Sequence, residues 1–321
     1  MNVKNKIKLK QNKIKKIYKQ NKLTHTYTQM GVYSKGEFKV MGYELKKEYC
    51  IWLGYMHILA VAGLIYWLLQ EKELFTKSLY MFLIFHLMGG LGITAGSHRL
   101  WAHRSYTAKT PYRILVMLFN SMAFQGSIFH WSRDHRLHHK FSDTDIDPHS
   151  MNKGFFFAHV GWLLVKKSPE LKKEGEKLNI QDLKDDPVVM FQKKHYFLIS
   201  TLVCFVIPTV IMQYTIGGGF IYNFLMSCFR YVFMLHTTWC VNSVCHMFGS
   251  RPYNESILPT ENLFVSIIAL GEGWHNWHHE YPRDWRAAEN KWTKINFTSG
   301  FIKFFEFLGQ CDTNGIKKNE S

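Results

Sequence analysis

Residues 78–103, SLYMFLIFHLMGGLGITAGSHRLWAH, join an apolar segment to a pair of histidines. The apolar part, Ser78–Ser97, has about the twenty residues that an α-helix needs to cross the hydrocarbon core of a bilayer. His98 and His103 follow it directly, and a spacing of five does not align two side chains on a regular helix. We therefore expect a membrane-spanning helix that ends here and presents both imidazoles at one face of the membrane.

Three other segments have the length and composition of membrane-spanning helices, at about residues 50–70, 196–216 and 220–241. The links between neighbouring segments are too short for a domain, so the four segments form two helical hairpins. Few strongly polar side chains interrupt them, namely His57, His86, Arg230 and His236. A charge is costly in lipid, so Arg230 should face protein, water or a headgroup.

The expected fold class is an all-α integral membrane protein, with four transmembrane helices in two hairpins and a cytosolic helical cap. The membrane domain should cover residues 42–310, with the cap at 98–195 and 242–310 and a C-terminal tail at 311–321. One apolar run in the cap, Tyr112–Phe129, is long enough for a fifth crossing. A crossing there would separate the histidines described below, so we expect an interfacial or partly embedded helix.

Positive charge is concentrated at the N-terminus. The chain has 40 Lys and Arg against 24 Asp and Glu, and residues 1–22 hold nine lysines and no acid. A low-complexity run of this kind predicts a solvated, disordered tail at 1–41, or else a polybasic contact with nucleic acid or anionic lipid. No nucleic-acid fold follows it, which favours the bilayer. The positive-inside rule places both termini in the cytosol.

Composition excludes two further classes. With 47% hydrophobic residues the chain is not intrinsically disordered as a whole. Six cysteines in 321 residues are too few for a disulfide scaffold.

Nine of the 17 histidines fall into a constellation typical of a metal centre. Besides His98 and His103, the motif His-x-x-His-His occurs twice and a further histidine follows the last span: His135, His138, His139, His275, His278, His279 and His246. Residues at i, i+3 and i+4 share a helical face, so each motif should offer two or three imidazoles to one point. Imidazole suits iron, copper, zinc and nickel, and this many ligands implies two ions.

A single His-x-x-His-His motif could be a surface accident, but two copies on one side of a membrane are typical of a binding site. Nearby carboxylates could fix the histidine tautomers: Asp134, Asp143, Asp145, Asp147 and Glu272. A two-metal site at a membrane face suits dioxygen activation on a lipid. Aromatic residues near the motifs could line an apolar channel or simply pack in the core: Phe129, Trp131, Phe141 and Trp239.

Taken together, the motifs resemble those of the membrane acyl-CoA desaturases of the stearoyl-CoA type found in animals. The resemblance runs from about residue 42 to 308 and is carried by GITAGSHRLWAHRSY (92–106), WSRDHRLHHKFSD (131–143), DPH (147–149), GFFFAHVGWLLV (154–165), VNS (241–243) and GEGWHNWHH (271–279).

The resemblance implies roles for particular residues. The nine histidines would hold two irons as a di-iron centre, with Asn242 acting through a water. Arg133, Lys166 and Lys167 match positions that bind the coenzyme A part. Tunnel-shaping positions would be Gln125, Trp131, Thr238 and Trp239, and His86 and Gly90 would lie near the far end of the tunnel, where they could affect chain length.

The implied activity is insertion of a cis double bond, at Δ9, into a saturated long-chain acyl-CoA. Dioxygen would be the co-substrate, and electrons would come from NADH through a reductase and cytochrome b5 at the endoplasmic reticulum membrane. Two alternatives remain open from the residues alone. One is a hydroxylase, ketolase or sphingolipid desaturase with the same histidine motifs, and the other is a transporter or non-enzymatic metal-binding membrane protein.

Overall fold

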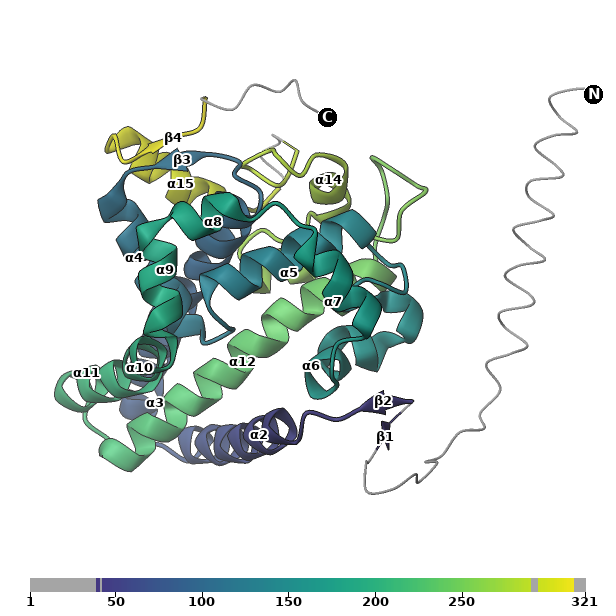
Figure 1. Ribbon diagram of the computed structural model, residues 1–321. Coiled ribbons are helices and arrows are strands. Elements are labelled where there is room, and N and C mark those ends of the chain that lie inside the picture. The colour runs from purple at the N-terminus through teal and green to yellow at the C-terminus, as the bar shows by residue number, and fades with distance from the viewer. Residues whose placement is uncertain (1–38, 41, 290–293, 315–321) are drawn as a thin grey trace, which may run out of the picture. The chain divides into compact units, whose positions relative to one another are not determined.

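The computed structural model describes residues 39–40, 42–289 and 294–314 (Figure 1). The chain forms two units, Met1–Leu45 and Lys46–Ser321. In the described part of the first, β1 (Lys39–Val40) pairs antiparallel with β2 (Tyr43–Glu44). The expected basic tail, residues 1–41, lies almost entirely outside the described residues.

Three helical segments of the second unit are long and apolar enough to cross a membrane. They are α2 (Lys47–Leu68), α3 (Lys72–Leu91) continued by the π-helix η1 (Gly92–Ala102), and the run of α10 (Tyr196–Thr201), η4 (Leu202–Val206) and α11 (Ile207–Thr215). They coincide with three of the four predicted spans. Large apolar side chains such as Ile58 and Leu69 are left exposed, as a lipid-facing surface requires.

The fourth predicted span, residues 220–241, lies within α12 (Phe220–Met247) but is not among these apolar segments. The reason is the number of polar side chains on α12, of which Asn223, Arg230 and Thr237 are all buried. Figure 1 shows α12 running through the middle of the unit, so neighbouring helices cover these side chains. Arg230 faces protein, as predicted, and its guanidinium donates to the carbonyl of Cys204 at 2.8 Å.

The predicted interfacial helix at 112–129 is divided in two. It becomes α4 (Thr110–Ala123) and α5 (Ile128–Phe141), which are bent by 82° at the break between them. Phe124 ends α4 in the left-handed region at φ 51°, and the Ser127 hydroxyl caps α5 by accepting from the backbone N–H of His130. By length and composition the pair could also be one broken or re-entrant membrane segment.

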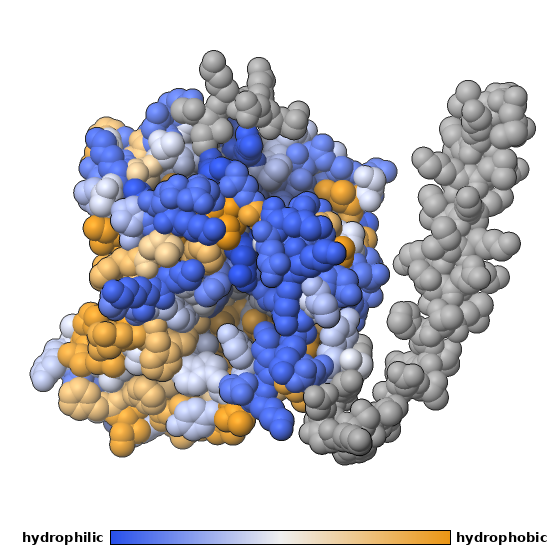
Figure 2. Space-filling model, viewed as in Figure 1, coloured by the Kyte–Doolittle hydropathy of each residue, from blue (hydrophilic) through white to orange (hydrophobic). Residues whose placement is uncertain are grey.

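Short helices joined by loops make up the rest of the unit: η2 (Met151–Lys153), η3 (Phe157–Gly161), α6 (Trp162–Leu164), α7 (Pro169–Glu176), α8 (Gln181–Asp185), α9 (Pro187–Lys194), α13 (Leu263–Ile268), α14 (His275–Glu280) and α15 (Phe297–Phe307). β3 (Thr107–Ala108) pairs with β4 (Cys311–Asp312), so regular pairing continues two residues past the expected boundary at 310. Figure 2 shows apolar residues gathered over α10 and α11 and polar residues over α7 and α8. The apolar surface thus lies over one of the three segments that could cross a membrane.

Candidate metal centre

The nine histidines of the predicted constellation meet in two clusters, in which each ring is buried or partly buried. The first contains His98, His103, His135, His139 and His278, and the second contains His138, His246, His275 and His279. Within each cluster the ligand nitrogens lie within 4.8 Å of one another. The rings come from η1 and the residue that follows it, and from α5, α12 and α14, so the centre connects segments from most of the chain.

The spacing of five between His98 and His103 has a structural explanation that differs from the predicted one. We expected the helix to end before these residues, but it continues as the π-helix η1. The backbone N–H of His103 donates to the carbonyl of His98 at 3.0 Å, which is an i→i+5 bond. A π-helix aligns residues five apart, and the two ring centroids lie 4.9 Å apart.

Each His-x-x-His-His motif contributes rings to both clusters, although its spacing predicted that its rings would share one site. On α5, His135 and His139 belong to the first cluster and His138 to the second. On α14 the division is reversed: one ring, His278, joins the first cluster, and the two others join the second. Both α5 and α14 therefore contact both clusters. Each cluster takes rings from both motifs, so both motifs are needed to complete it.

The distances between Nε2 atoms fit a bound ion. In the first cluster the separations are 3.0 Å for His98–His278, 2.8 Å for His103–His135 and 2.9 Å for His139–His278. In the second they are 3.1 Å for His246–His275, 3.1 Å for His275–His279 and 3.3 Å for His138–His279. Two nitrogens at right angles around an ion, each about 2.1 Å from it, lie about 3.0 Å apart. An imidazole set of this kind suits a first-row transition metal.

Three carboxylates hold the opposite ring nitrogens. The Nδ1 atom of His98 lies 2.8 Å from Glu272, that of His138 lies 2.9 Å from Asp147, and that of His246 lies 2.8 Å from Asp143. A hydrogen bond from Nδ1–H to a carboxylate leaves the Nε2 lone pair free for a metal. Of the other two predicted carboxylates, Asp134 pairs with cations as described below, and Asp145 uses its backbone carbonyl to accept from Lys153.

Burial sets the charge state of six of the nine rings. It lowers the pKa of six ring systems well below the usual range, which keeps them neutral and able to donate a lone pair: His103, His135, His139, His275, His278 and His279. Burial opposes ionisation of Glu272, but attraction by His98 and Arg99 outweighs it and lowers the pKa of Glu272 to about 2. The carboxylate therefore stays ionised beside the rings.

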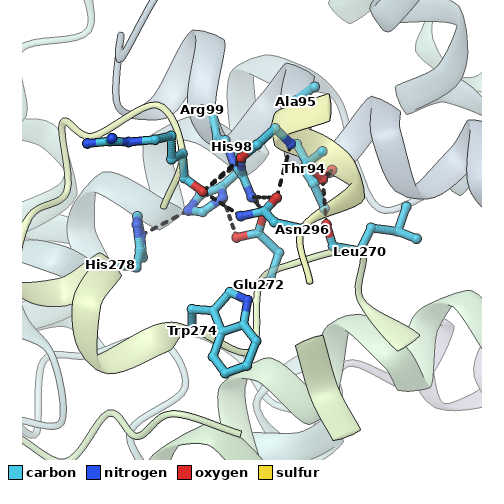
Figure 3. A network of polar contacts seen from close by, with 12 residues as sticks. Thr94, Ala95, His98, Arg99, Leu270, Glu272, Trp274, His278 and Asn296 are labelled. Carbon is cyan, nitrogen blue, oxygen red and sulfur yellow. Dashed lines mark hydrogen bonds and ion pairs between the residues drawn. The ribbon is translucent and has the colours of Figure 1, made fainter. Parts of the chain in front are cut away.

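Arg99 is a structural residue of the centre that sequence reasoning missed. Its side chain is 1% exposed, and its Nη2 atom donates to Glu272 at 2.8 Å (Figure 3). Nη1 donates to the carbonyls of Trp285 and Arg286 at 3.1 and 3.0 Å. Arg99 thus fixes the carboxylate that orients His98. The available signal was an arginine next to a metal-type histidine inside an otherwise apolar run.

A cavity opens on both clusters. Its walls include His98 and His135 of the first cluster and His138 and His275 of the second. Five other predicted site residues line it: His86, Gly90, Trp131, Thr238 and Asn242. The remaining wall is largely apolar, with Ile93, Met234, Val241, Ile268, Ala269 and Leu270. A largely apolar cavity next to a candidate metal centre is suited to a hydrocarbon chain.

Two predicted tunnel residues lie beside this cavity and not in its wall. Gln125 donates to the Thr238 hydroxyl at 2.9 Å and so connects the break between α4 and α5 to α12. Trp239 is buried and packs in a cluster with residues of α2, with its ring 6.4 Å from that of His57. Neighbouring positions on one helix therefore face different surroundings.

Two of the three cations predicted to bind coenzyme A converge on one carboxylate. Arg133 and Lys167 contact Asp134 at 2.8 and 2.5 Å. Burial would raise the pKa of Asp134, but the two cations hold it below its usual value. Lys166 is exposed and adjacent in sequence. The structure thus places a partly exposed basic group beside His135, in the middle of α5.

Two imidazole clusters that border one largely apolar cavity, in a helical protein with segments that could cross a membrane, are typical of a metal-dependent membrane oxidoreductase. The family model described as fatty acid desaturase matches residues 76–288, and the chain belongs to this family. The match confirms the resemblance drawn from the sequence motifs.

The relatives are animal desaturases. The chain is 49% identical to an acyl-CoA Delta-9 desaturase of Acheta domesticus, over 79% of this chain and 70% of the relative. It is 48% identical to Delta(9)-fatty-acid desaturase fat-6 of Caenorhabditis elegans, over 79% and 74%. It is 47% identical to the stearoyl-CoA desaturase of Bos taurus, over 81% and 71%. Relatives of similar identity are named Delta(11) and Delta12 desaturases.

Proposed function

We propose that this protein is an acyl-CoA desaturase that inserts a cis double bond into a saturated long-chain acyl-CoA, with Δ9 as the position. The observation that carries the proposal is the cavity that borders both histidine clusters and has largely apolar walls. An acyl chain in this cavity would pass the metal centre with one pair of methylenes next to it. The Δ9 names of several relatives support that position over Δ11 and Δ12.

The nine clustered histidines would hold two iron ions, and Asn242 would act through a water. The donor set favours iron over harder ions because every first ligand is an imidazole. When bound, the iron pair supplies dioxygen activation strong enough to remove hydrogen from an unactivated C–H bond. The protein's own part is to orient the ligands through Glu272, Asp147 and Asp143, and to exclude water from the cavity.

The substrate would be held at both ends. Arg133, Lys166 and Lys167 would bind the phosphates of coenzyme A, for which fixed cations are required. Trp131, Thr238, Gln125 and Trp239 would shape the bend of the acyl tunnel. At the far end, a Cβ atom on Gly90 would lie 2.6 Å from Cδ1 of Leu270, so this position and His86 are suited to limit chain length.

The proposed setting is the endoplasmic reticulum membrane. α12 would form the fourth crossing because it packs along α2 and α3, and four crossings place both termini in the cytosol. The membrane domain would cover residues 42–310. Electrons would come from NADH through its reductase and cytochrome b5, as separate partners, and no nucleic acid is involved.

Expression in a yeast strain that lacks its own desaturase tests the function. Wild-type protein should restore growth without added unsaturated fatty acid, and mass spectrometry of the lipids should locate the double bond at Δ9. His138→Ala should abolish the product and lower the iron content, whereas His195→Ala, outside both clusters, should do neither. Hydroxylated lipid as the product would support the hydroxylase alternative, and purified protein without iron would contradict the metal assignment.

A further inference from the structure

Three aromatic side chains are in contact on the side of α14 that faces away from the metal centre. Trp277 lies two residues from both His275 and His279, so it projects about 200° around the helix axis from these rings. Its ring meets the Tyr253 ring edge-on, with centroids 4.8 Å apart, and the Tyr281 ring at a tilt, with centroids 4.5 Å apart. Trp277 is partly buried and Tyr281 is 46% exposed, so the group runs from beside the centre to the surface.

Two members of this group donate hydrogen bonds to carboxylates. Nε1–H of Trp277 donates to Oδ2 of Asp284 at 3.2 Å, and the Tyr253 hydroxyl donates to Glu289. Arg286 donates to the same carboxylate of Asp284 at 2.8 Å and holds it beside the indole. An indole or a phenol loses an electron more easily when a neighbouring base takes the proton that it releases. Trp277 and Tyr253 are therefore placed for reversible one-electron oxidation.

Trp274, in the same motif, has the opposite surroundings. The Lys294 ammonium lies over its ring, 4.1 Å from the centroid, and its Nε1–H donates to the backbone carbonyl of Ile295 at 2.9 Å. A cation on the ring face opposes the loss of an electron, and a carbonyl is too weak a base to take the proton. The same ammonium is farther from the Tyr253 ring, at 5.8 Å. Of the two tryptophans beside the α14 histidines, Trp277 is therefore the one suited to oxidation.

An oxygen-activating centre needs such a route when no substrate is bound. The proposed reaction requires an oxidant strong enough to remove hydrogen from a C–H bond, and the acyl chain is its proper target. Without an acyl chain, the nearest oxidisable groups are in the cavity wall, which includes Met234 and Trp131. Methionine is converted to its sulfoxide, a polar group that disrupts apolar surroundings. A second route for the oxidising equivalent would protect the cavity.

We propose that Trp277, Tyr253 and Tyr281 form a protective path that reduces the oxidised centre when no acyl chain is bound. The proposal rests on the proposed function. In each transfer, Trp277 gives one electron to the centre and its N–H proton to Asp284. A tyrosine then gives one electron to the Trp277 radical, which recovers its proton from Asp284, while the phenol proton passes to Glu289 or to water. A thiol or ascorbate in solution returns a hydrogen atom to the tyrosine, so the net change is one electron gained by the centre, one electron lost by the reductant and one proton released.

The first test follows the path without any iron chemistry. Purified protein is loaded with zinc, which binds imidazole and has no redox chemistry, and is oxidised by azide radicals in pulse radiolysis. Azide radicals take one electron from tryptophan, and optical absorption then follows transfer from tryptophan to tyrosine. We expect a fast phase that is independent of protein concentration in wild type and lost in Trp277→Phe. Trp285→Phe, which removes an indole that lies beneath Lys303, is the control and should keep this phase.

The second test uses iron-loaded enzyme that receives electrons and dioxygen but no acyl-CoA. Trp277→Phe should become inactive several-fold faster than wild type, and peptide mass spectrometry should find more oxidation of Met234 and Trp131. Trp277→Tyr should behave like wild type, because phenol can be oxidised and benzene cannot, although both rings fill the same space. A purely structural role would not separate these two variants. With saturating acyl-CoA, initial kcat and KM should be the same in all three proteins.

An unchanged fast phase in Trp277→Phe would overturn the path, and so would wild-type rates of inactivation and of Met234 oxidation in that variant. If Trp277→Phe lost iron, the double variant Tyr253→Phe, Tyr281→Phe would decide, since neither tyrosine lies in α14. Loss of the fast phase and faster inactivation in the double variant would support the path, and wild-type behaviour would overturn it. Failure of the proposed function looks different, because wild type itself would then give no alkene, whereas the radiolysis result does not depend on that function.

Discussion

Nδ1 of His98 and Oε2 of Glu272 lie 2.8 Å apart, although the first residue lies in the π-helix that continues a membrane-type helix and the second belongs to a loop far along the chain. The contact sets the tautomer of His98 and leaves its Nε2 atom directed at the first cluster. Arg99 holds the other carboxylate oxygen. The geometry of the centre therefore depends on this carboxylate as much as on the rings.

Glu272→Gln should weaken metal binding without removing a ligand. The amide cannot accept from His98 and Arg99 as an ionised carboxylate does, and loss of such a partner costs about 10–100-fold in metal affinity. We expect lower iron content at limiting iron, measured by metal analysis, and activity that recovers with added iron. Glu170→Gln on the exposed surface of α7 is the matched control. Wild-type iron affinity in Glu272→Gln would contradict this role.

Gly90→Val should shift chain-length preference toward shorter acyl chains. A Cβ at this position already meets Cδ1 of Leu270 at 2.6 Å, so two added methyl groups reach into the cavity. Excluding a methylene costs roughly tenfold or more in specificity. The measurement is the ratio of kcat/KM values for acyl-CoAs that differ by two carbons. Gly54→Val is the control, since a Cβ there meets nothing within 4 Å. An unchanged ratio would mean that the acyl chain does not reach Gly90.

Arg133→Ala should raise the KM for acyl-CoA and leave the iron bound. A charge-assisted contact contributes about 1.5–3 kcal/mol, which corresponds to roughly 10–100-fold in KM. The loss should be smaller for the free fatty acid, which has no coenzyme A phosphates. Arg104→Ala, whose side chain is 55% exposed, should leave KM unchanged. Loss of iron in Arg133→Ala would show that the residue supports the centre instead.

Removal of iron by a chelator should lower the melting temperature of the purified protein. An ion that binds only the folded state stabilises it by about 4 kcal/mol when its free concentration is about 1,000 times Kd. Without iron, the nine clustered rings face one another with no ion between them, and the protein loses this stabilisation. Unfolding in detergent, followed by tryptophan fluorescence, measures the shift, and added ferrous iron should reverse it. An equal melting temperature with and without iron would argue against a centre that contributes to stability.

Much of the fold could be predicted because hydropathy is a local property. Three apolar segments occur as long helices where the sequence placed them. The fourth segment, α12, does not meet the same hydropathy criterion. Its polar residues are compatible with a membrane helix only when other helices cover them. Similarly, nothing in residues 112–129 indicated the left-handed Phe124 that breaks the run and aims α5 at the centre.

By itself, the sequence determined which side chains can bind metal, because residue type and helical spacing limit the choice to a few imidazoles. It also indicated the carboxylates, of which Asp143, Asp147 and Glu272 do contact the rings. Only the tertiary structure decided how the rings divide between two clusters, and that Tyr253 packs against Trp277. The physical reason is that these contacts join residues from segments distant in sequence, and their distances depend on how those segments pack.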